Sequence, residues 1–165
     1  MLVVLFLANC HTDTIPKGNR LNGIVNEVVW GTMNLEDLQI VRLPLIEDDR
    51  GSLVFAEVEQ LLPFAPQRFF VVHSVPHSQV RGEHAHKELH EFVVALKGSV
   101  KINIMNNDGE REFLLNDPTM GLHIPPKTWR ILSDYSADSI LLVLASDKYD
   151  ADDYIRDFED FKSLQ

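Results

Sequence analysis

The chain has 165 residues, of which 45% are apolar and 24% are charged, a balance typical of one globular domain with a buried core. Its net charge of −10 excludes a nucleic-acid partner that is bound through a basic patch. Cys10 is the only cysteine, which excludes an intrachain disulfide. We therefore expect a cytoplasmic protein without nucleic-acid or membrane partners.

Residues 1–33 are predicted to form an extension, poorly ordered or dispensable, and residues 34–165 to form the folded domain. The apolar run at positions 1–8 is far too short for a membrane-spanning helix. No Lys or Arg precedes it, as one would in a signal peptide. Patterned sequence begins only after Met33, which favours a dispensable extension.

Short β-type runs, separated by turns at even spacing, follow from Leu38 onward. The predicted strands comprise residues 38–45, 52–58, 68–75, 91–96, 100–105, 112–115, 121–124, 129–132 and 140–145. Tight turns are predicted at Gly98 and at Gly109, where Gly tolerates a positive φ. Strands at this spacing favour an all-β sandwich or barrel.

Helical periodicity occurs only at residues 152–164, near the end of the chain. Its apolar residues recur at steps of three and four, which predicts a short C-terminal helix. Asp152 and Asp153 are expected near the N-terminus of this helix, where the helix dipole favours negative charge. The three tyrosines, Tyr135, Tyr149 and Tyr154, are expected to pack the barrel or this helix.

The most informative segment contains two histidines separated by one residue, His84 and His86. In a strand both side chains point to the same face, where imidazoles can bind a metal or transfer protons. Glu91 and Gly98 follow, and this spacing resembles the first motif of the cupin fold. The alternative is that these histidines are solvated loop residues beside a charged stretch.

Metal-binding cupins take a further histidine from a second motif, which resembles residues 121–130 here. The ligand position falls on Arg130, which has no lone pair and would repel a divalent cation. The sequence therefore favours acid–base chemistry on an anionic substrate, with no metal and no cofactor. His90 or His123 stays open as a replacement metal ligand.

From residue 38 to its end the chain resembles the TDP-4-keto-6-deoxyglucose 3,4-ketoisomerases and related WxcM-like cupins. The resemblance is carried by residues 81–87, 98–100, 108–109, 121–129, 142–146 and 149–158. It implies an RmlC-like jelly roll that forms a homodimer with exchanged strands. It also implies a role in making amino sugars for bacterial surface polysaccharides. Family members often carry tyrosines in the strand that here reads Phe69-Phe70-Val71-Val72.

The activity that the resemblance implies moves a ketone between C4 and C3 of a nucleotide-linked hexose through an enediol. Imidazoles are suited to this proton transfer, and the resemblance assigns it to His84 and His86. Candidate substrate-binding residues are Arg81, Arg130, Trp129, Arg50 and His123.

Three of these candidates also have a purely structural interpretation. Trp129 could pack the core, Arg50 could form an ion pair in an acidic turn, and Arg81 could be a surface charge near Glu83. For the whole protein, the alternatives are a metal-dependent cupin enzyme, such as a dioxygenase or isomerase, and a non-catalytic sugar-binding cupin.

Overall fold

The computed structural model describes Leu35, Leu38 and residues 40–58 and 60–164. The predicted extension, residues 1–33, therefore lies outside the described residues. No helix in the described part of the chain is both long and apolar enough to cross a membrane.

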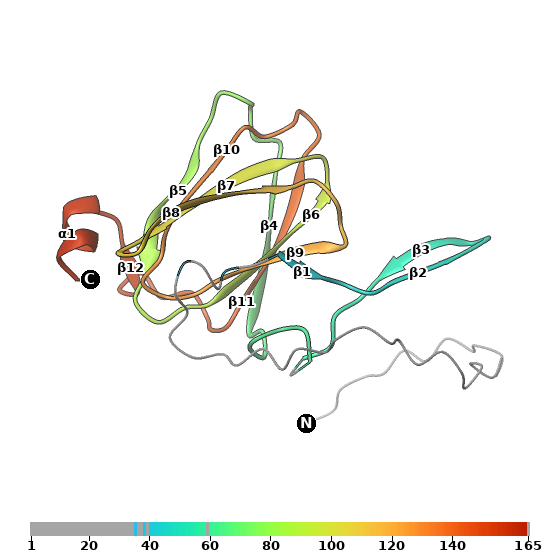
Figure 1. The fold of residues 1–165 in the computed structure, drawn as a ribbon, viewed down its shortest axis with the longest axis horizontal. Helices are drawn as coiled ribbons and strands as arrows, with labels where there is room; N and C mark the ends of the chain where they lie inside the picture. The colour runs from blue at the N-terminus through green and yellow to red at the C-terminus, as the bar shows by residue number, and fades with distance from the viewer. Residues whose placement is uncertain (1–34, 36–37, 39, 59, 165) are drawn as a thin grey trace.

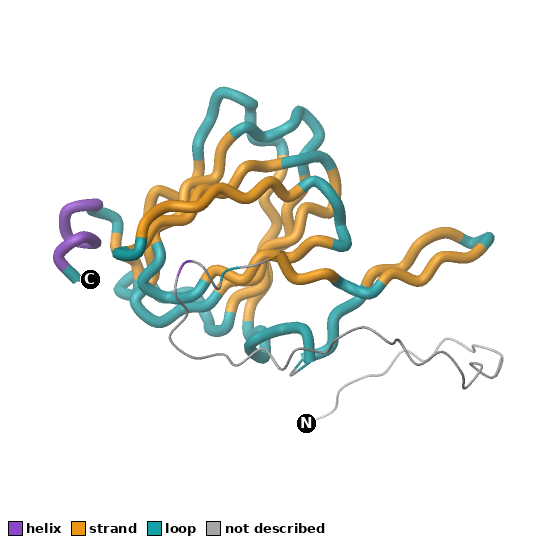
Figure 2. The backbone as a smooth tube through the Cα atoms, in the orientation of Figure 1, coloured by secondary structure: helices purple, strands orange, loops and turns teal. Residues whose placement is uncertain are grey.

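Two antiparallel sheets face each other and form the body of the molecule (Figures 1 and 2). The first sheet contains, in spatial order, β1 (Ile40–Arg42), β9 (Met120–Ile124), β6 (Glu91–Lys97), β11 (Ile140–Ala145) and β4 (Arg68–His73). The second contains β12 (Tyr154–Ile155), β5 (Arg81–His86), β10 (Trp129–Ser133), β7 (Val100–Asn106) and β8 (Gly109–Leu115). This arrangement confirms the all-β prediction.

The core lies between the sheets because alternate side chains of each strand point inward. In β7, Val100, Ile102 and Ile104 are fully buried, and the residues between them are only partly buried. Leu141 and Val143 of β11 meet them from the other sheet. The core between these strands is thus apolar.

The predicted turns are confirmed at both glycines. Gly98 joins β6 to β7 with a φ of 69°, and a Cβ there would collide with Ser136 and with the backbone of Ser139. Gly109 begins β8 after a tight turn and has a φ of 136°. Both positions therefore favour glycine.

The first two predicted strands, 38–45 and 52–58, are wrong in their boundaries. The chain instead forms β1 and then a separate hairpin of β2 (Leu45–Asp48) and β3 (Gly51–Val54). Pro44 has no N–H to continue a ladder, and the Asp48 carboxylate accepts a hydrogen bond from the Arg50 backbone, which closes the turn. This hairpin projects away from the sheets (Figure 1).

The predicted helix is correct only in its second half. Helix α1 comprises Phe158–Ser163, and the Asp157 side chain caps it by accepting hydrogen bonds from the next turn. Asp152 and Asp153 precede a strand rather than a helix, because the backbone of β12 pairs with β5. Tertiary pairing has here overridden the helical spacing of the apolar residues.

Candidate active site

His84 and His86 lie on β5, and their rings are close together, as the strand pattern predicts. The ring centroids are 5.0 Å apart and the rings are nearly perpendicular. The Tyr154 ring packs against both, with its centroid 4.9 Å from His84 and 4.3 Å from His86. Tyr154 takes this position because it is paired with His86 across β12 and β5.

A β-bulge in β5 determines which side chains ahead of the two histidines point to the inner face. Arg130 on β10 is opposite His84, whereas the next residue, Ile131, is opposite Gly82, so Glu83 is extra. Gly82 and Glu83 have φ values of 87° and 51°. A Cβ at Gly82 would lie 2.6 Å from the Arg130 carbonyl oxygen, so only glycine fits.

Each imidazole has its Nδ1 atom at an acceptor. The His84 Nδ1 lies 2.7 Å from the Gly82 carbonyl oxygen, and the His86 Nδ1 lies 2.7 Å from Asp153 Oδ2. Nδ1 therefore carries the proton in both neutral rings, and each Nε2 keeps its lone pair. The His86 Nε2 is buried without a hydrogen-bond partner among the described residues and lies 3.8 Å from Glu91 Oε1.

A buried ion pair lies beside the two histidines. The Arg130 guanidinium donates to Glu91 Oε2 at 2.5 Å and to the His84 carbonyl oxygen at 3.2 Å. Arg130 is 2% exposed and Glu91 is 7% exposed, so both charges are removed from water. Although burial raises it, the charge and the hydrogen bond of Arg130 hold the pKa of Glu91 below its ordinary value.

The same surroundings keep both imidazoles neutral at pH 7. Burial, followed by the charge of Arg130, lowers the pKa of His84 to about 4 and that of His86 to about 3. The Asp153 carboxylate acts in the other direction at the moment of proton transfer, because it favours the imidazolium. The site thus contains two neutral bases beside a fixed positive charge.

Between the sheets lies a cavity of about 150 Å³, which we call the inner cavity. Its polar lining residues come from the second sheet and from the segment after β10: Arg81, His84, Arg130 and Tyr135, with Glu91 from the first sheet. Two arginines and one carboxylate give this lining a positive balance. Arg81 is exposed and His84 is half-buried, so the cavity is open to solvent on their side.

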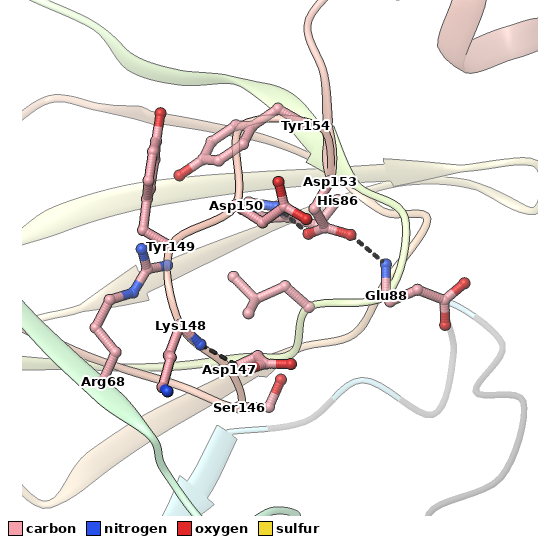
Figure 3. Close-up of a pocket in the computed structure, with 11 residues that line it drawn as sticks. Arg68, His86, Glu88, Ser146, Asp147, Lys148, Tyr149, Asp150, Asp153 and Tyr154 are labelled. Atoms are coloured by element: carbon pink, nitrogen blue, oxygen red, sulfur yellow. Dashed lines mark hydrogen bonds and ion pairs between the residues drawn. The ribbon is translucent and has the colours of Figure 1, made fainter.

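A second cavity, of about 350 Å³, lies against the C-terminal segment, and we call it the tail cavity (Figure 3). Two cations line it, Arg68 and Lys148, but the carboxylates outnumber them. These carboxylates are Glu88, Asp147, Asp150 and Asp153. Although it is larger, the tail cavity is the poorer receptor for an anionic ligand. Tyr154 lines both cavities.

Three predicted substrate-binding residues lie away from both cavities. Trp129 is buried on the outer side of β10, where its ring contacts Phe158 and Phe161 of α1. Neighbouring residues of a strand point to opposite faces, so Arg130 inside requires Trp129 outside. Trp129 thus packs the core, which was the alternative interpretation.

Arg50 and His123 are the other two. Arg50 lies at the exposed tip of the β2–β3 hairpin, where it forms a 2.5 Å ion pair with Asp48. His123 is buried on the outer face of the first sheet, and its Nε2 lies 2.9 Å from His90 Nδ1. Phe64 packs beside this pair of histidines, and burial lowers the pKa of His123 to about 3.

His90 and His123 therefore cannot complete a metal site with His84 and His86, because the first sheet separates the two pairs. Among the residues that the structure describes, no three or more His, Cys, Asp or Glu side chains are placed to hold a metal ion. Arg130 fills the space beside His84 and Glu91, and its charge makes that space unfavourable for a divalent cation.

Sequence reasoning missed Asp153, which was expected at a helix terminus. Its two carboxylate oxygens accept hydrogen bonds from His86 Nδ1 and from the backbone N–H of Glu88, at 2.7 and 2.8 Å. Figure 3 shows Asp153 beside His86 with Tyr154 close to both. The missing signal was long-range, since 67 positions separate Asp153 from His86.

An all-β fold with paired histidines on one inner strand defines this protein as a member of the cupin class. Within it, the chain belongs to the family described as FdtA: WxcM-like, C-terminal, whose model matches residues 36–165. The predicted family is thereby confirmed.

Known relatives agree with this assignment. The chain is 36% identical over 124 residues to the TDP-4-oxo-6-deoxy-alpha-D-glucose-3,4-oxoisomerase of Aneurinibacillus thermoaerophilus, covering 75% of this chain and 89% of that protein. The crystal structure of QdtA, a sugar 3,4-ketoisomerase from Thermoanaerobacterium thermosaccharolyticum in complex with TDP, superposes with a TM-score of 0.76 at 37% identity. That match covers 79% of this chain and 96% of QdtA.

A 3,4-ketoisomerase from Helicobacter canadensis matches with a TM-score of 0.75 at 34% identity, over 78% of this chain and 96% of that chain. The dTDP-4-dehydrorhamnose 3,5-epimerase of Bacillus anthracis, at 19% identity, shares the fold with a TM-score of 0.65 over 74% of this chain and 79% of its own. The RmlC-like fold prediction is thus confirmed.

Proposed function

We propose that this protein is a TDP-4-keto-6-deoxyhexose 3,4-ketoisomerase that works by proton transfer through His84 and His86. The observation that carries the proposal is a pair of neutral imidazoles, 5.0 Å apart, beside the buried Arg130 guanidinium. The 36% identical relative from Aneurinibacillus thermoaerophilus is a 3,4-oxoisomerase of TDP-4-oxo-6-deoxy-alpha-D-glucose, which supports the same substrate class here.

In the proposed reaction, a base removes the proton from C3, which is acidic because C4 carries the carbonyl group. The electrons form an enediol as the C4 oxygen gains a proton. The C3 oxygen then loses its proton, C4 takes one up, and the ketone is at C3. His84 suits the role of base, since it lines the inner cavity, its Nδ1 is held at the Gly82 carbonyl oxygen and its Nε2 has a lone pair.

His86 and Arg130 complete the proposed machinery. His86 lines the tail cavity, but its Nε2 lies 3.8 Å from Glu91 Oε1 at the wall of the inner cavity, where it can return or receive the second proton. Asp153 at Nδ1 stabilises its imidazolium. Arg130 meets the negative charge that develops on the enediolate oxygens. Its bonds to Glu91 and to the His84 carbonyl leave the other N–H groups of the guanidinium for a ligand oxygen.

The inner cavity is the proposed sugar site because its lining carries the positive balance. At about 150 Å³ it is smaller than the roughly 300–1,000 Å³ of sites that enclose whole ligands, so the nucleotide would lie outside it. Arg81, exposed at the opening, is placed to bind the diphosphate through paired hydrogen bonds.

We further propose that the enzyme acts as a homodimer in the cytoplasm, without a metal or other cofactor. Two apolar surfaces support self-association: the outer face of the edge strand β4, with Phe69 and Val71, and the projecting β2–β3 hairpin. Its product, a 3-keto sugar nucleotide, would supply an aminotransferase in surface-polysaccharide synthesis.

The direct test is incubation with TDP-4-keto-6-deoxyglucose in deuterated water, followed by NMR of the products. We expect the 3-keto isomer with deuterium at C4. A non-catalytic sugar-binding protein would bind the nucleotide-sugar but incorporate no deuterium. A metal-dependent cupin would contain stoichiometric transition metal and would lose activity together with that metal on chelation.

His86→Asn should lower turnover by about 100-fold or more, because one of the two proton-transfer groups is lost while the ring is replaced by a smaller polar group. The fold should remain, as judged by circular dichroism. His73→Asn is the matched control, since His73 is exposed at the end of β4 and lines neither cavity. Near-normal turnover of the His86 variant would refute its role in proton transfer.

A further inference from the structure

Tyr135 carries a buried hydroxyl group that no contact among the described residues explains. The residue is 0% exposed, and its ring packs within the main apolar cluster between the sheets. Its hydroxyl oxygen has no hydrogen-bond partner among the described residues. A phenylalanine would pack equally well without burying an unsatisfied polar group, so the hydroxyl is costly to the empty protein.

The position of this hydroxyl group is fixed by the backbone around it. Asp134 has a φ of 51°, which turns the chain at the end of β10. The Tyr135 carbonyl oxygen lies 3.0 Å from His77 Nδ1, and the Ser136 N–H donates to the Ser99 carbonyl oxygen at 3.0 Å. Hydrogen bonds at Tyr135 and at the next residue thus hold the ring in place.

Tyr135 lines the inner cavity together with Arg81, His84 and Arg130. Burial raises the pKa of Tyr135 to about 12, although the nearby charge of Arg81 acts in the other direction. The phenol therefore stays protonated across the working pH range and always has a proton to donate. A fixed donor without a partner, on a residue that lines a cavity, is arranged for a ligand oxygen.

We propose that Tyr135 is a substrate-binding residue whose hydroxyl group donates a hydrogen bond to a sugar oxygen in the inner cavity. This inference rests on the proposed function for the identity of the ligand, a nucleotide-linked keto sugar. Arg81 holds the diphosphate at the opening, and Tyr135 fixes the orientation of the sugar ring deeper inside. The pairing of the phenol occurs only in the complex, so binding recovers the cost of burying it.

The test is Tyr135→Phe, which removes one oxygen and keeps the ring. We expect kcat/KM for TDP-4-keto-6-deoxyglucose to fall by about tenfold or more, the effect of one lost hydrogen bond. The free energy of unfolding should stay equal or rise, because the variant no longer buries an unpaired hydroxyl group. A purely structural role predicts the reverse, a less stable protein with unchanged kinetics, and that result would overturn the proposal.

Thr128→Val is the matched control, because it removes a buried hydroxyl group that does have a partner. Thr128 Oγ1 donates to the Pro126 carbonyl oxygen at 3.1 Å, and the residue lines neither cavity. This variant should be less stable than the parent protein and equally active. Tyr135→Phe should therefore lower activity without lowering stability, and Thr128→Val should lower stability without lowering activity.

A binding measurement separates this proposal from the proposed function. In calorimetric titrations, Tyr135→Phe should bind TDP as the parent protein does but should bind TDP-glucose about tenfold more weakly. If the parent protein binds TDP-glucose without isomerising the keto sugar, the proposed function fails. The affinities of parent and variant for TDP-glucose still test the role of Tyr135 in that case. Equal affinity of variant and parent for TDP-glucose would refute the role of Tyr135, and a parent protein that binds neither nucleotide would refute both.

Discussion

His86 is held by a partner that sets which of its nitrogens can act. Asp153 accepts from His86 Nδ1 with one oxygen and from the Glu88 backbone N–H with the other. The backbone donor matters because it fixes the orientation of the carboxylate. Any replacement for Asp153 has to satisfy both donors at once.

Asp153→Asn cannot do so, because an amide has only one oxygen. If that oxygen stays on the Glu88 N–H, the amide nitrogen faces Nδ1 and forces the proton of His86 onto Nε2. We expect kcat to fall by about 10²–10⁴-fold with little change in KM. ¹⁵N NMR of the ring should report the changed tautomer, which a merely structural role for Asp153 would not produce.

The control is Asp152→Asn, which removes the same charge one residue earlier. The contact of Asp152 with the neighbouring strand is through its carbonyl oxygen, which accepts from Lys87 Nζ at 2.7 Å, so kcat should not change. Wild-type kcat in the Asp153 variant would show that His86 needs no positioning residue.

The sequence was sufficient for the histidine pair but not for its surroundings. His84, His86, Glu91 and Arg130 follow from spacing along single strands, which local sequence encodes. Asp153 depends on the pairing of β12 with β5, which no local pattern reports. Tyr135 follows β10, and only the φ of 51° at the residue before it turns the chain there.

At the scale of elements, strand alternation could have excluded one assignment in advance. Trp129 and Arg130 are consecutive on β10 and cannot both face the inner cavity. Because Arg130 was already assigned to the position of a metal ligand on the inner face, Trp129 could have been assigned to the outer face. By contrast, the start of the C-terminal helix could not be located from the sequence, because Tyr154 and Ile155 have helical spacing and are nevertheless paired in a sheet.

The edge strand β4 makes a prediction about assembly. Phe69 is 69% exposed on its outer face, an unusual position for a large aromatic ring unless another surface covers it. Phe69→Glu should convert the proposed dimer to a monomer, because a charge would be buried in an apolar interface. Sedimentation velocity measures this change directly.

Leu114→Glu is the control, since Leu114 is 50% exposed on β8, in the other sheet, and the variant should remain dimeric. A parent protein that sediments as a monomer would contradict the proposed assembly at once.

At the scale of the whole molecule, we propose that the folded domain begins close to residue 34. Leu35 and Leu38 are buried in the core, and Arg111 Nη1 donates to both of their carbonyl oxygens, at 2.9 and 2.6 Å. Removal of residues 1–33 should therefore leave solubility, melting temperature and activity nearly unchanged.

A longer deletion, of residues 1–38, is the contrasting variant. It removes both leucines, and truncating one buried leucine typically costs about 2–5 kcal/mol. Its melting temperature should fall clearly below that of the shorter deletion. Loss of soluble protein with the shorter deletion would refute the proposed boundary.

Glu83, the extra residue of the bulge in β5, divides the part of the cavity wall that β5 forms into two segments. Without the bulge, Arg81 would share a face with Glu83 rather than with His84. Because of it, the group at the entrance and the bases inside belong to different segments of one strand, joined at Gly82. The residue at the entrance, which we propose binds the diphosphate, can therefore be exchanged without moving the two histidines, in evolution or by design.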